Sequence, residues 1–278
     1  MELVTAAPVA ALRVPSDAHV ARCAVRALLR ELETYPKPGL VSLVDSGSHA
    51  DMHASHFVAS ASVLRGAFRA FARSGREDGE FAALRRIGVE AEVAMARATG
   101  GRNTHRGAIF SLGLLCAAAA RIGRGSLGTR VRIRWGDDLA AHRRDPASHG
   151  SAVTRAHGIA GAALEAARGF PSVFETALPA YRRLRADGVA APLARVHAFF
   201  TLVEVVDDTN LLHRGGTAGL AYARQAARQF LAAGGMRSPE GCARALSIHR
   251  EFVRRNLSAG GCADLLACTL FADMLERA

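Results

Sequence analysis

Lysine is almost absent from this sequence: Lys37 is the only one, and every other formal cation is an arginine. Aromatic residues are also scarce, at 6% of the chain. The longest apolar run, from Gly107 to Ala120, is bracketed by Arg106 and Arg121 and is shorter than the roughly 20 residues that a bilayer requires. We therefore expect no membrane-spanning helix and no membrane partner.

The cysteines argue against a disulfide scaffold. Their number, 5, is odd, and no two of them form a Cys-x-x-Cys pair. Such usage indicates reduced thiols in a cytoplasmic protein. The N-terminus carries an acidic second residue and no basic region before its apolar stretch, so no secretory signal is predicted and a cytoplasmic location is expected.

The charge is lopsided, with 36 Lys+Arg against 25 Asp+Glu and a formal net charge of +11. A basic nucleic-acid-binding module is one alternative that such a charge suggests. It would interleave clustered cations with aromatic side chains, whereas here the arginines are dispersed and the aromatics few. We expect no nucleic-acid partner and attribute much of the arginine to coding bias.

Apolar residues recur at helical spacing through most of the 278 residues. The pattern predicts an all-α single domain over 1–278 of roughly nine helices, with about residues 1–15 disordered. VRIRW at 131–135 alternates like a strand and is a candidate hairpin or linker. Helices are expected, within a few residues, over 17–34, from near Asp51 onward, and over 77–98, 107–122, 148–166, 172–186, 191–212, 216–233, 239–256 and 261–276. Ser16 is expected to cap the first of these helices, and Pro239 to occupy the first helical position after a Ser238 cap. The helix over 107–122 is apolar nearly all round, so it is expected to be central to the fold.

Glycine-rich polar segments interrupt this pattern at 35–52, 99–107, 207–216 and 256–267. Each adjoins a predicted helix end and carries a hydroxyl, an imidazole or a cation. Free backbone N–H groups and the helix dipole make such N-termini favourable for phosphate oxygens. Together the segments suggest a polyphosphate ligand, although a single one would indicate only the end of a helix.

Lys37 strengthens this interpretation because it lies between two prolines in the first of these segments. Lysine provides a compact point charge that the planar guanidinium of arginine does not reproduce. Its survival in a chain that otherwise uses arginine favours a specific role over a solvated turn.

Acidic residues accompany the same segments, and carboxylates near a polyphosphate usually hold magnesium. The residues are Glu31, Asp45, Asp51, Glu204, Asp207 and Asp208. Glu204 and Asp208 are expected one helical turn apart on the same face. A zinc site at His49, His53 and His56 is an alternative, but the glutamate of an HExxH motif is absent. No nucleophile elbow surrounds Ser46 or Ser48, so serine catalysis is not supported.

Five motifs in order carry a family resemblance: YPKPGLVSLVDSGSHADM, GGRNTHRGAIFSLGLL, EAARGFP, DDTNLLHRGG and SAGGCADLLA. With their spacing they resemble the triphosphoribosyl-dephospho-CoA synthase family from about residue 20 to 275. The first motif is more similar to the malonate decarboxylase branch than to the citrate lyase branch. The resemblance implies an all-α pentosyltransferase that joins ATP to the ribose 2′-hydroxyl of 3′-dephospho-CoA and releases adenine. It also implies that the product is the precursor of a prosthetic group attached to an acyl carrier protein.

The resemblance carries over the following site positions: Glu31, Lys37, Asp45, Ser48, His49, Asp51, Asn103, His105, Arg106, Glu165, Asp208, Asn210, Arg214, Gly215, Ser258, Gly260, Gly261 and Asp264. Within that set we assign the phosphates to Lys37, His105, Arg106, Arg214 and the loop 258–261. Asp51 and Asp208 are the candidate ligands of Mg²⁺. Glu31, Asp45 and Glu165 are alternative candidates for the catalytic base, and the other members are candidate substrate contacts.

The main alternative enzyme is an all-α magnesium-dependent phosphohydrolase or ADP-ribosyl hydrolase-like protein. It would share the acidic metal ligands and nucleotide loops but would need an activated water. Adenine release that depends on dephospho-CoA distinguishes the transferase from this hydrolase.

Overall fold

The structure, a computed structural model, describes residues 14–141 and 161–276, and every regular element within them is a helix. The all-α class is therefore confirmed for these residues, with more helices than the roughly nine that periodicity predicts. A π-helix, η1 (Ser172–Ala177), and a 3-10 helix, η2 (Gly235–Arg237), are short. The α-helices are α1 (Asp17–Leu32), α2 (Ala54–Arg76), α3 (Phe81–Ala98), α4 (Arg106–Ala119), α5 (Leu127–Ala141), α7 (Gly161–Ala167), α8 (Leu178–Ala186), α9 (Ala191–Val205), α10 (Thr209–Ala232), α11 (Gly241–Arg254) and α12 (Gly260–Glu276).

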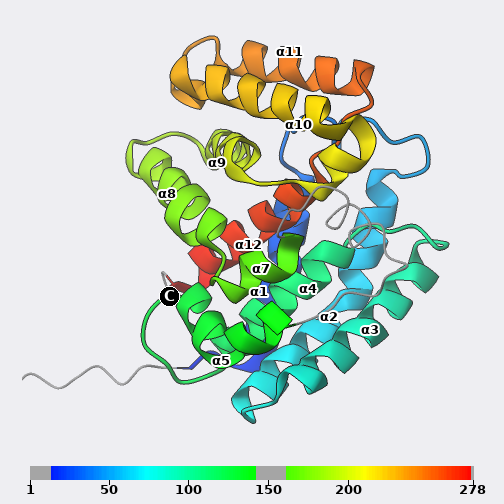
Figure 1. Ribbon diagram of the computed structural model, residues 1–278, viewed down its shortest axis with the longest axis vertical. Helices are drawn as coiled ribbons and strands as arrows, with labels where there is room; N and C mark the ends of the chain where they lie inside the picture. Colours follow the sequence, from blue (N-terminus) through cyan, green and yellow to red (C-terminus); the bar gives the residue numbers. More distant parts are fainter. Residues whose placement is uncertain (1–13, 142–160, 277–278) are drawn as a thin grey trace, which may run out of the picture.

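The core is centred on α12, which runs through the middle of the molecule and packs against α1, α4 and α9 (Figure 1). Both α4 and α12 are buried along almost their whole length. Helices that are apolar on all sides must be surrounded by other helices to remove that surface from water. The prediction that the apolar helix near 107–122 is central to the fold is confirmed.

The N-terminal ends of α4, α10 and α12 and the connection between α1 and α2 meet at one end of the core. α10 and α11 pair above this region, and α9 lies beneath α10 (Figure 1). Ser16 caps α1, as predicted, because its side chain accepts a hydrogen bond from the His19 amide. Helix α1 ends at Leu32, shortly before the Pro-Lys-Pro turn that begins at Pro36, since proline cannot continue a helix.

The strand prediction for VRIRW is wrong, because these residues lie inside α5. Val131, Trp135 and Leu139 recur at four-residue spacing and are buried, whereas Ile133 is 73% exposed. The apolar residues that alternate in the sequence therefore belong to an amphipathic helix, which buries one of its faces and exposes Ile133 on another. The Trp135 indole also donates to the Gly79 carbonyl at 3.1 Å, which anchors α5 beside the start of α3.

The helix predicted over 191–212 is interrupted, because α9 and α10 are separate helices. The Asp208 side chain accepts hydrogen bonds from the amides of Asn210 and Leu211 and so caps a new helix. The expectation that Glu204 and Asp208 lie on one helical face is therefore wrong.

Other helix boundaries differ by a few residues. The second helix begins at Ala54 instead of near Asp51, and Pro239 precedes α11 instead of lying in its first turn. Most of the predicted helix over 148–166, and nearly all of the predicted disordered segment 1–15, lie outside the described residues.

Within residues 14–141 and 161–276, no helix combines the length and the apolar character that a membrane crossing would require. All of the cysteines are free thiols, and only Cys242 is exposed.

Helices α2 and α4 cross so closely that glycine is required at the contact. A Cβ atom on Gly75 would lie 2.0 Å from the carbonyl oxygen of Ala117, and one on Gly113 would lie 2.6 Å from the Phe71 ring. The two glycines let the helix axes approach more closely than larger residues would allow.

Gly75→Ala should therefore lower the free energy of unfolding by about 1–3 kcal/mol, because the helices must separate to admit the methyl group. Gly66→Ala is the matched control on the same helix, since its Cβ would meet nothing within 4 Å. It should raise the stability by about 0.5–1 kcal/mol through helix propensity alone. Urea denaturation measures both, and a Gly75→Ala protein as stable as the wild type would contradict the close crossing.

Candidate functional site

The structure brings the four glycine-rich segments together at the N-terminal end of α12. Segment 35–52 joins α1 to α2, 99–107 leads into α4, 207–216 opens α10, and 256–267 opens α12. The sequence places them far apart, and the packing of α4, α10 and α12 makes them neighbours.

Hydrogen bonds join the connection between α1 and α2 to the other segments. The Ser48 hydroxyl donates to the Leu257 carbonyl at 2.6 Å, and Arg214 donates to the Ser48 carbonyl at 2.9 Å. Arg102 donates to the Asp51 carbonyl at 2.5 Å. The segments that carry the predicted site residues thus form one hydrogen-bonded unit.

Asp208 ties two of the helix N-termini together. Its Oδ1 accepts from the amides of Asn210 and Leu211 at 2.8 and 3.1 Å, and its Oδ2 accepts from the Cys262 amide at 2.8 Å. The side chain is fully buried, and burial raises its pKa although these N–H groups act in the opposite direction. Asp208 therefore stabilises the start of α10 and α12 as a cap.

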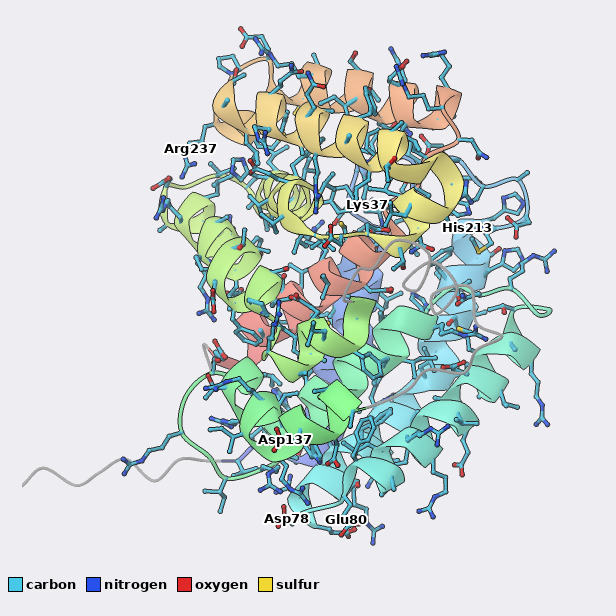
Figure 2. All side chains as sticks on the ribbon, viewed as in Figure 1. Lys37, Asp78, Glu80, Asp137, His213 and Arg237 are labelled. Atoms are coloured by element: carbon cyan, nitrogen blue, oxygen red, sulfur yellow. The ribbon has the colours of Figure 1, made fainter. Side chains whose placement is uncertain are left out.

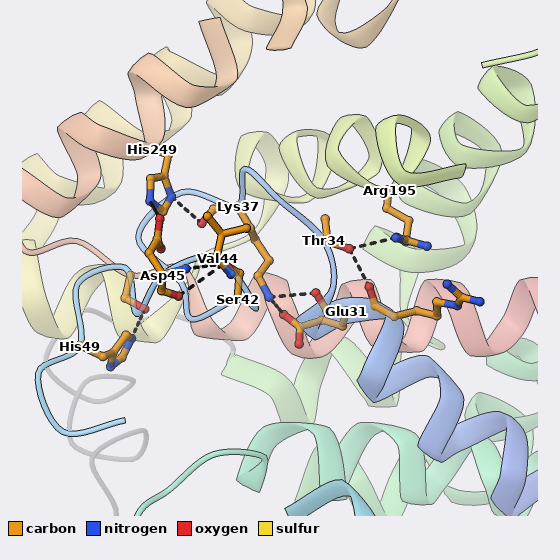
Figure 3. A network of polar contacts seen from close by, with 11 residues as sticks. Glu31, Thr34, Lys37, Ser42, Val44, Asp45, His49, Arg195 and His249 are labelled. Atoms are coloured by element: carbon orange, nitrogen blue, oxygen red, sulfur yellow. Dashed lines mark hydrogen bonds and ion pairs between the residues drawn. The ribbon is translucent and has the colours of Figure 1, made fainter. Parts of the chain in front are cut away.

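Lys37 lies in the interior of the molecule, in contrast to the labelled acidic residues at the other end (Figure 2). Its ammonium donates to the Glu31 carbonyl oxygen at 3.0 Å and forms an ion pair with Oε1 of the same residue (Figure 3). Both side chains are almost entirely buried, and burial raises the pKa of Glu31 although Lys37 lowers it. Removing one partner of such a buried pair is strongly destabilising, because the other charge is left unpaired.

Asp264, in the first turns of α12, contacts the start of α4. The Ala108 amide donates to its carboxyl group, and a Cβ on Gly107 would lie 2.0 Å from Oδ2. Burial, Glu31 and Asp208 together raise the pKa of Asp264 well above its usual value. Asp264 therefore interacts with both the Glu31–Lys37 pair and Asp208, at the starts of α4 and α12.

His105 has a ring nitrogen without a partner in the interior. Nδ1 hydrogen-bonds the Ser60 hydroxyl at 2.7 Å, whereas the buried Nε2 has none. Burial, aided by Lys37, lowers the pKa of His105 to about 3. The ring is therefore neutral at physiological pH and contributes a hydrogen-bonding nitrogen, not a positive charge.

His49 connects two of the predicted substrate-binding residues. Arg214 donates to its Nδ1 at 3.1 Å, so Nε2 carries the hydrogen and donates to the Ser258 hydroxyl at 3.0 Å. Burial and the Arg214 charge lower the pKa of His49 to about 4. Arg214 also donates to Asn256 Oδ1 at 2.8 Å. Its side chain is half-buried at the edge of the site.

Asp45 contacts a residue that sequence reasoning did not find. This residue is His249 of α11 (Figure 3). Its Nε2 lies 3.1 Å from Asp45 Oδ2, and its Nδ1 lies 3.1 Å from the Lys37 carbonyl oxygen. The other Asp45 oxygen accepts from the Gly47 amide at 3.0 Å, and the Tyr35 hydroxyl also donates to this carboxylate. A single histidine on an amphipathic helix carries no local signal of such a contact.

Three predicted site residues make local contacts of their own. Glu165 accepts from the Ser172 amide at 2.9 Å, at the start of η1, and burial raises its pKa. Exposed Asn103 accepts from the Arg106 amide at 3.2 Å, and Arg106 forms a partly exposed ion pair with Glu92.

The predicted glycines occupy places where a side chain would collide with a neighbour. A Cβ on Gly260 would lie 2.8 Å from Asn210 Nδ2, and one on Gly215 would lie 2.5 Å from Leu257 Cδ2. A Cβ on Gly261 would lie 3.1 Å from Asp208 Oδ2. These glycines allow the starts of α10 and α12 to approach each other.

The described part of the chain holds no group of three or more His, Cys, Asp or Glu side chains arranged to bind a metal ion. His53 and His56 stack on each other at 5.7 Å, but His49 bonds elsewhere, so the zinc alternative gains no support. Asp51 is exposed, and both oxygens of Asp208 already accept backbone hydrogen bonds.

A cavity of about 710 Å³ lies between α5, η1 and α8, near the C-terminal end of α12. Its lining includes Arg132, Arg168 and Arg182, but Arg182 is paired with Asp273 and Glu276. The cavity is separated from the cluster around Lys37 by most of the length of α12, so it is not part of this site.

Comparison with known proteins identifies one family over nearly the whole chain. A family model described as ATP:dephospho-CoA triphosphoribosyl transferase matches residues 17–278. No solved structure matches the chain.

Curated relatives cover most of the chain and carry one name, "Probable 2-(5''-triphosphoribosyl)-3'-dephosphocoenzyme-A synthase". The protein from Pseudomonas paraeruginosa is 42% identical over 269 residues, which are 93% of this chain and 91% of the relative. That from Stutzerimonas stutzeri is 41% identical over 279 residues, with 96% of each chain covered. The Azotobacter vinelandii protein is 40% identical over 262 residues, with 91% of this chain and 90% of its own covered.

Lys37→Met and Glu31→Gln should each lower the free energy of unfolding by about 3–5 kcal/mol, because each leaves a buried group without its partner. The double variant should lose less than the sum of the two, since it removes both charges. Chemical denaturation at neutral pH measures this cycle.

Arg30→Gln provides the control, because its ion pair with Glu33 lies one turn away and is 52% and 36% exposed. It should cost no more than about 1 kcal/mol. Additive losses at Lys37 and Glu31 would show that the buried pair is not energetically coupled.

Proposed function

Because the chain belongs to the ATP:dephospho-CoA triphosphoribosyl transferase family, we propose that it transfers the triphosphoribosyl group of ATP to the ribose 2′-hydroxyl of 3′-dephospho-CoA. The family makes it an enzyme of the transferase class. The observation that carries the proposal is that the motif segments, distant in sequence, assemble around the buried Lys37 cluster.

In the proposed reaction, the bond between C1′ and N9 of ATP breaks and its electron pair leaves with adenine. The 2′-oxygen of dephospho-CoA forms a bond to C1′, and the triphosphate stays on the transferred ribose. The hydroxyl proton passes to an enzyme carboxylate, and adenine takes up a proton as it leaves. Nearby carboxylates favour the positive charge that develops at C1′.

We assign the phosphates to the cations and helix N-termini at this end of the fold. Arg106 and Arg214 retain exposed surface, and the loop 258–261 precedes the N-terminal amides of α12. The Lys37 charge acts from the interior, beneath these groups. His105 is proposed as a neutral contact, with Ser48, His49, Asn103, Asn210 and Gly215 as the other substrate-binding positions.

Among the candidate bases, the environments of Glu31 and Glu165 support proton transfer better than that of Asp45. Burial raises the pKa of both glutamates, which makes their carboxylates stronger bases. Both carboxylate oxygens of Asp45 are instead engaged in contacts within the protein, with His249, the Gly47 amide and the Tyr35 hydroxyl. These contacts make Asp45 less available to accept a proton from substrate.

We propose that magnesium arrives with ATP, held mainly by phosphate oxygens, since Mg²⁺ commonly takes only one or two protein carboxylates. When bound, it would neutralise part of the triphosphate charge. Asp51 and Asp208 remain the proposed protein contacts, and no step in this mechanism passes through the metal.

We further propose that the product supplies the prosthetic group of an acyl carrier protein. The first motif favours a malonate decarboxylase over a citrate lyase as the recipient. The free thiols support a reducing cytoplasm as the place of action.

The reaction itself is tested by incubating the full-length protein with Mg-ATP and 3′-dephospho-CoA and analysing the products by mass spectrometry. We expect free adenine and a dephospho-CoA adduct that carries one triphosphoribosyl group. Adenine or phosphate released at the same rate without dephospho-CoA would contradict the transfer and indicate a hydrolase.

The base is tested with Glu31→Gln and Glu165→Gln. The variant that lacks the base should lose kcat by about 10²–10⁴-fold while KM changes little. In the wild type, kcat should fall as the pH drops through the raised pKa of that glutamate, which lies above the ordinary value of 4.5. Equal, small losses in both variants would exclude both residues as the base.

A further inference from the structure

The connection between α1 and α2 has no helix of its own from residue 35 to 52, yet it carries Lys37, Ser48 and His49. At its tip, Leu43 and Val44 are 61% and 64% exposed. Such a segment keeps its shape only through the contacts made along its length.

His249 makes two of these contacts from a distant part of the chain. Its ring is 3% exposed and bonds the Lys37 carbonyl and the Asp45 carboxylate, at sequence separations of 212 and 204 residues. The two contacts span the turn from Lys37 to Asp45, which Figure 3 shows wrapped against α11.

Both partners of His249 are hydrogen-bond acceptors. A neutral imidazole donates from only one nitrogen, so satisfying a carbonyl and a carboxylate at once requires a hydrogen on each nitrogen. One of the two partners is the Asp45 carboxylate, and hydrogen bonds to an ionised acceptor are stronger than neutral ones.

Neighbouring groups complete the arrangement. The Tyr35 ring packs edge-on against His249 at 5.4 Å, and its hydroxyl donates to Asp45. Asp45 and Tyr35 are the titratable groups that face the imidazole from the loop, while Arg250, next along α11, interacts with Tyr35. The Lys37 ammonium points away, toward Glu31.

We infer that His249, Asp45 and Tyr35 form a clamp that positions the Lys37 loop for ATP binding, with His249 as a positioning residue that does not touch substrate. The inference rests on the proposed function only for the identity of the ligand. The loop geometry that it describes stands on the contacts within the protein.

His249→Gln tests the clamp, because glutamine donates to only one of the two acceptors at a time. We expect KM for ATP to rise about 10- to 100-fold while kcat changes by less than about threefold, as for the loss of one charge-assisted hydrogen bond that orders the loop. Arg244→Gln, an exposed cation on the same helix, should leave both values unchanged. A His249→Gln enzyme with unaltered KM for ATP would overturn the inference.

Asp45→Asn distinguishes positioning from general structural damage, because its amide can still form a hydrogen bond with the His249 ring and preserve the contact. KM for ATP should therefore rise less in Asp45→Asn than in His249→Gln. A larger rise in Asp45→Asn than in His249→Gln would contradict the clamp.

Hydrogen exchange gives a readout that does not need activity. Amide protection of residues 42–48, corrected for intrinsic rates, should be lower in His249→Gln than in the wild type. If His249→Gln does not fold, Tyr35→Phe provides the same test, because it removes the hydrogen bond to Asp45 and should weaken the protection. Asp45→Asn, which can still bond the ring, should keep protection closer to that of the wild type. Equal protection in all of these proteins would overturn the clamp, whereas a wild type that releases no adenine would refute only the proposed function.

Discussion

The buried ammonium of Lys37 is paired with Glu31 and interacts with Asp264, and the packing at this end of the molecule depends on how these buried charges are balanced. Removing charged groups from water is costly unless each finds a partner. Glu31 is paired with the ammonium, and Asp208 is held by three backbone amides. Burial, Glu31 and Asp208 raise the pKa of Asp264 well above its usual value. Because these groups interact, their titrations are coupled, and a change at one alters the protonation of the others.

The same cluster explains why three helices begin at one place. Helix N-termini leave backbone N–H groups without partners and concentrate positive potential, so acidic side chains are stabilised there. Asp208 serves α10 and α12, and Asp264 serves α4. The glycines at 107, 260 and 261 allow these contacts because no side chain intervenes. An arrangement that stabilises buried carboxylates in this way also favours the phosphates of the proposed substrate.

Histidines in this region differ in their surroundings. His49 and His105 are desolvated beside cations, which keeps them neutral. His249 instead lies between two hydrogen-bond acceptors, the Lys37 carbonyl and the Asp45 carboxylate. The sequence motifs assigned His49 and His105 to substrate binding. They did not indicate a role for His249, because no local pattern reveals what a histidine on α11 contacts.

The sequence by itself determined the all-α class, the central position of α4, the Ser16 cap and the importance of the glycine-rich segments, since these depend on local periodicity and residue chemistry. Only the tertiary structure decided that Lys37 is buried against Glu31, that VRIRW is helical, and that a new helix begins at Asp208. Each of those outcomes depends on which donors, acceptors and apolar faces meet after packing. The contact between His249 and Lys37, 212 residues apart, illustrates why: it exists only when α11 folds back onto the loop.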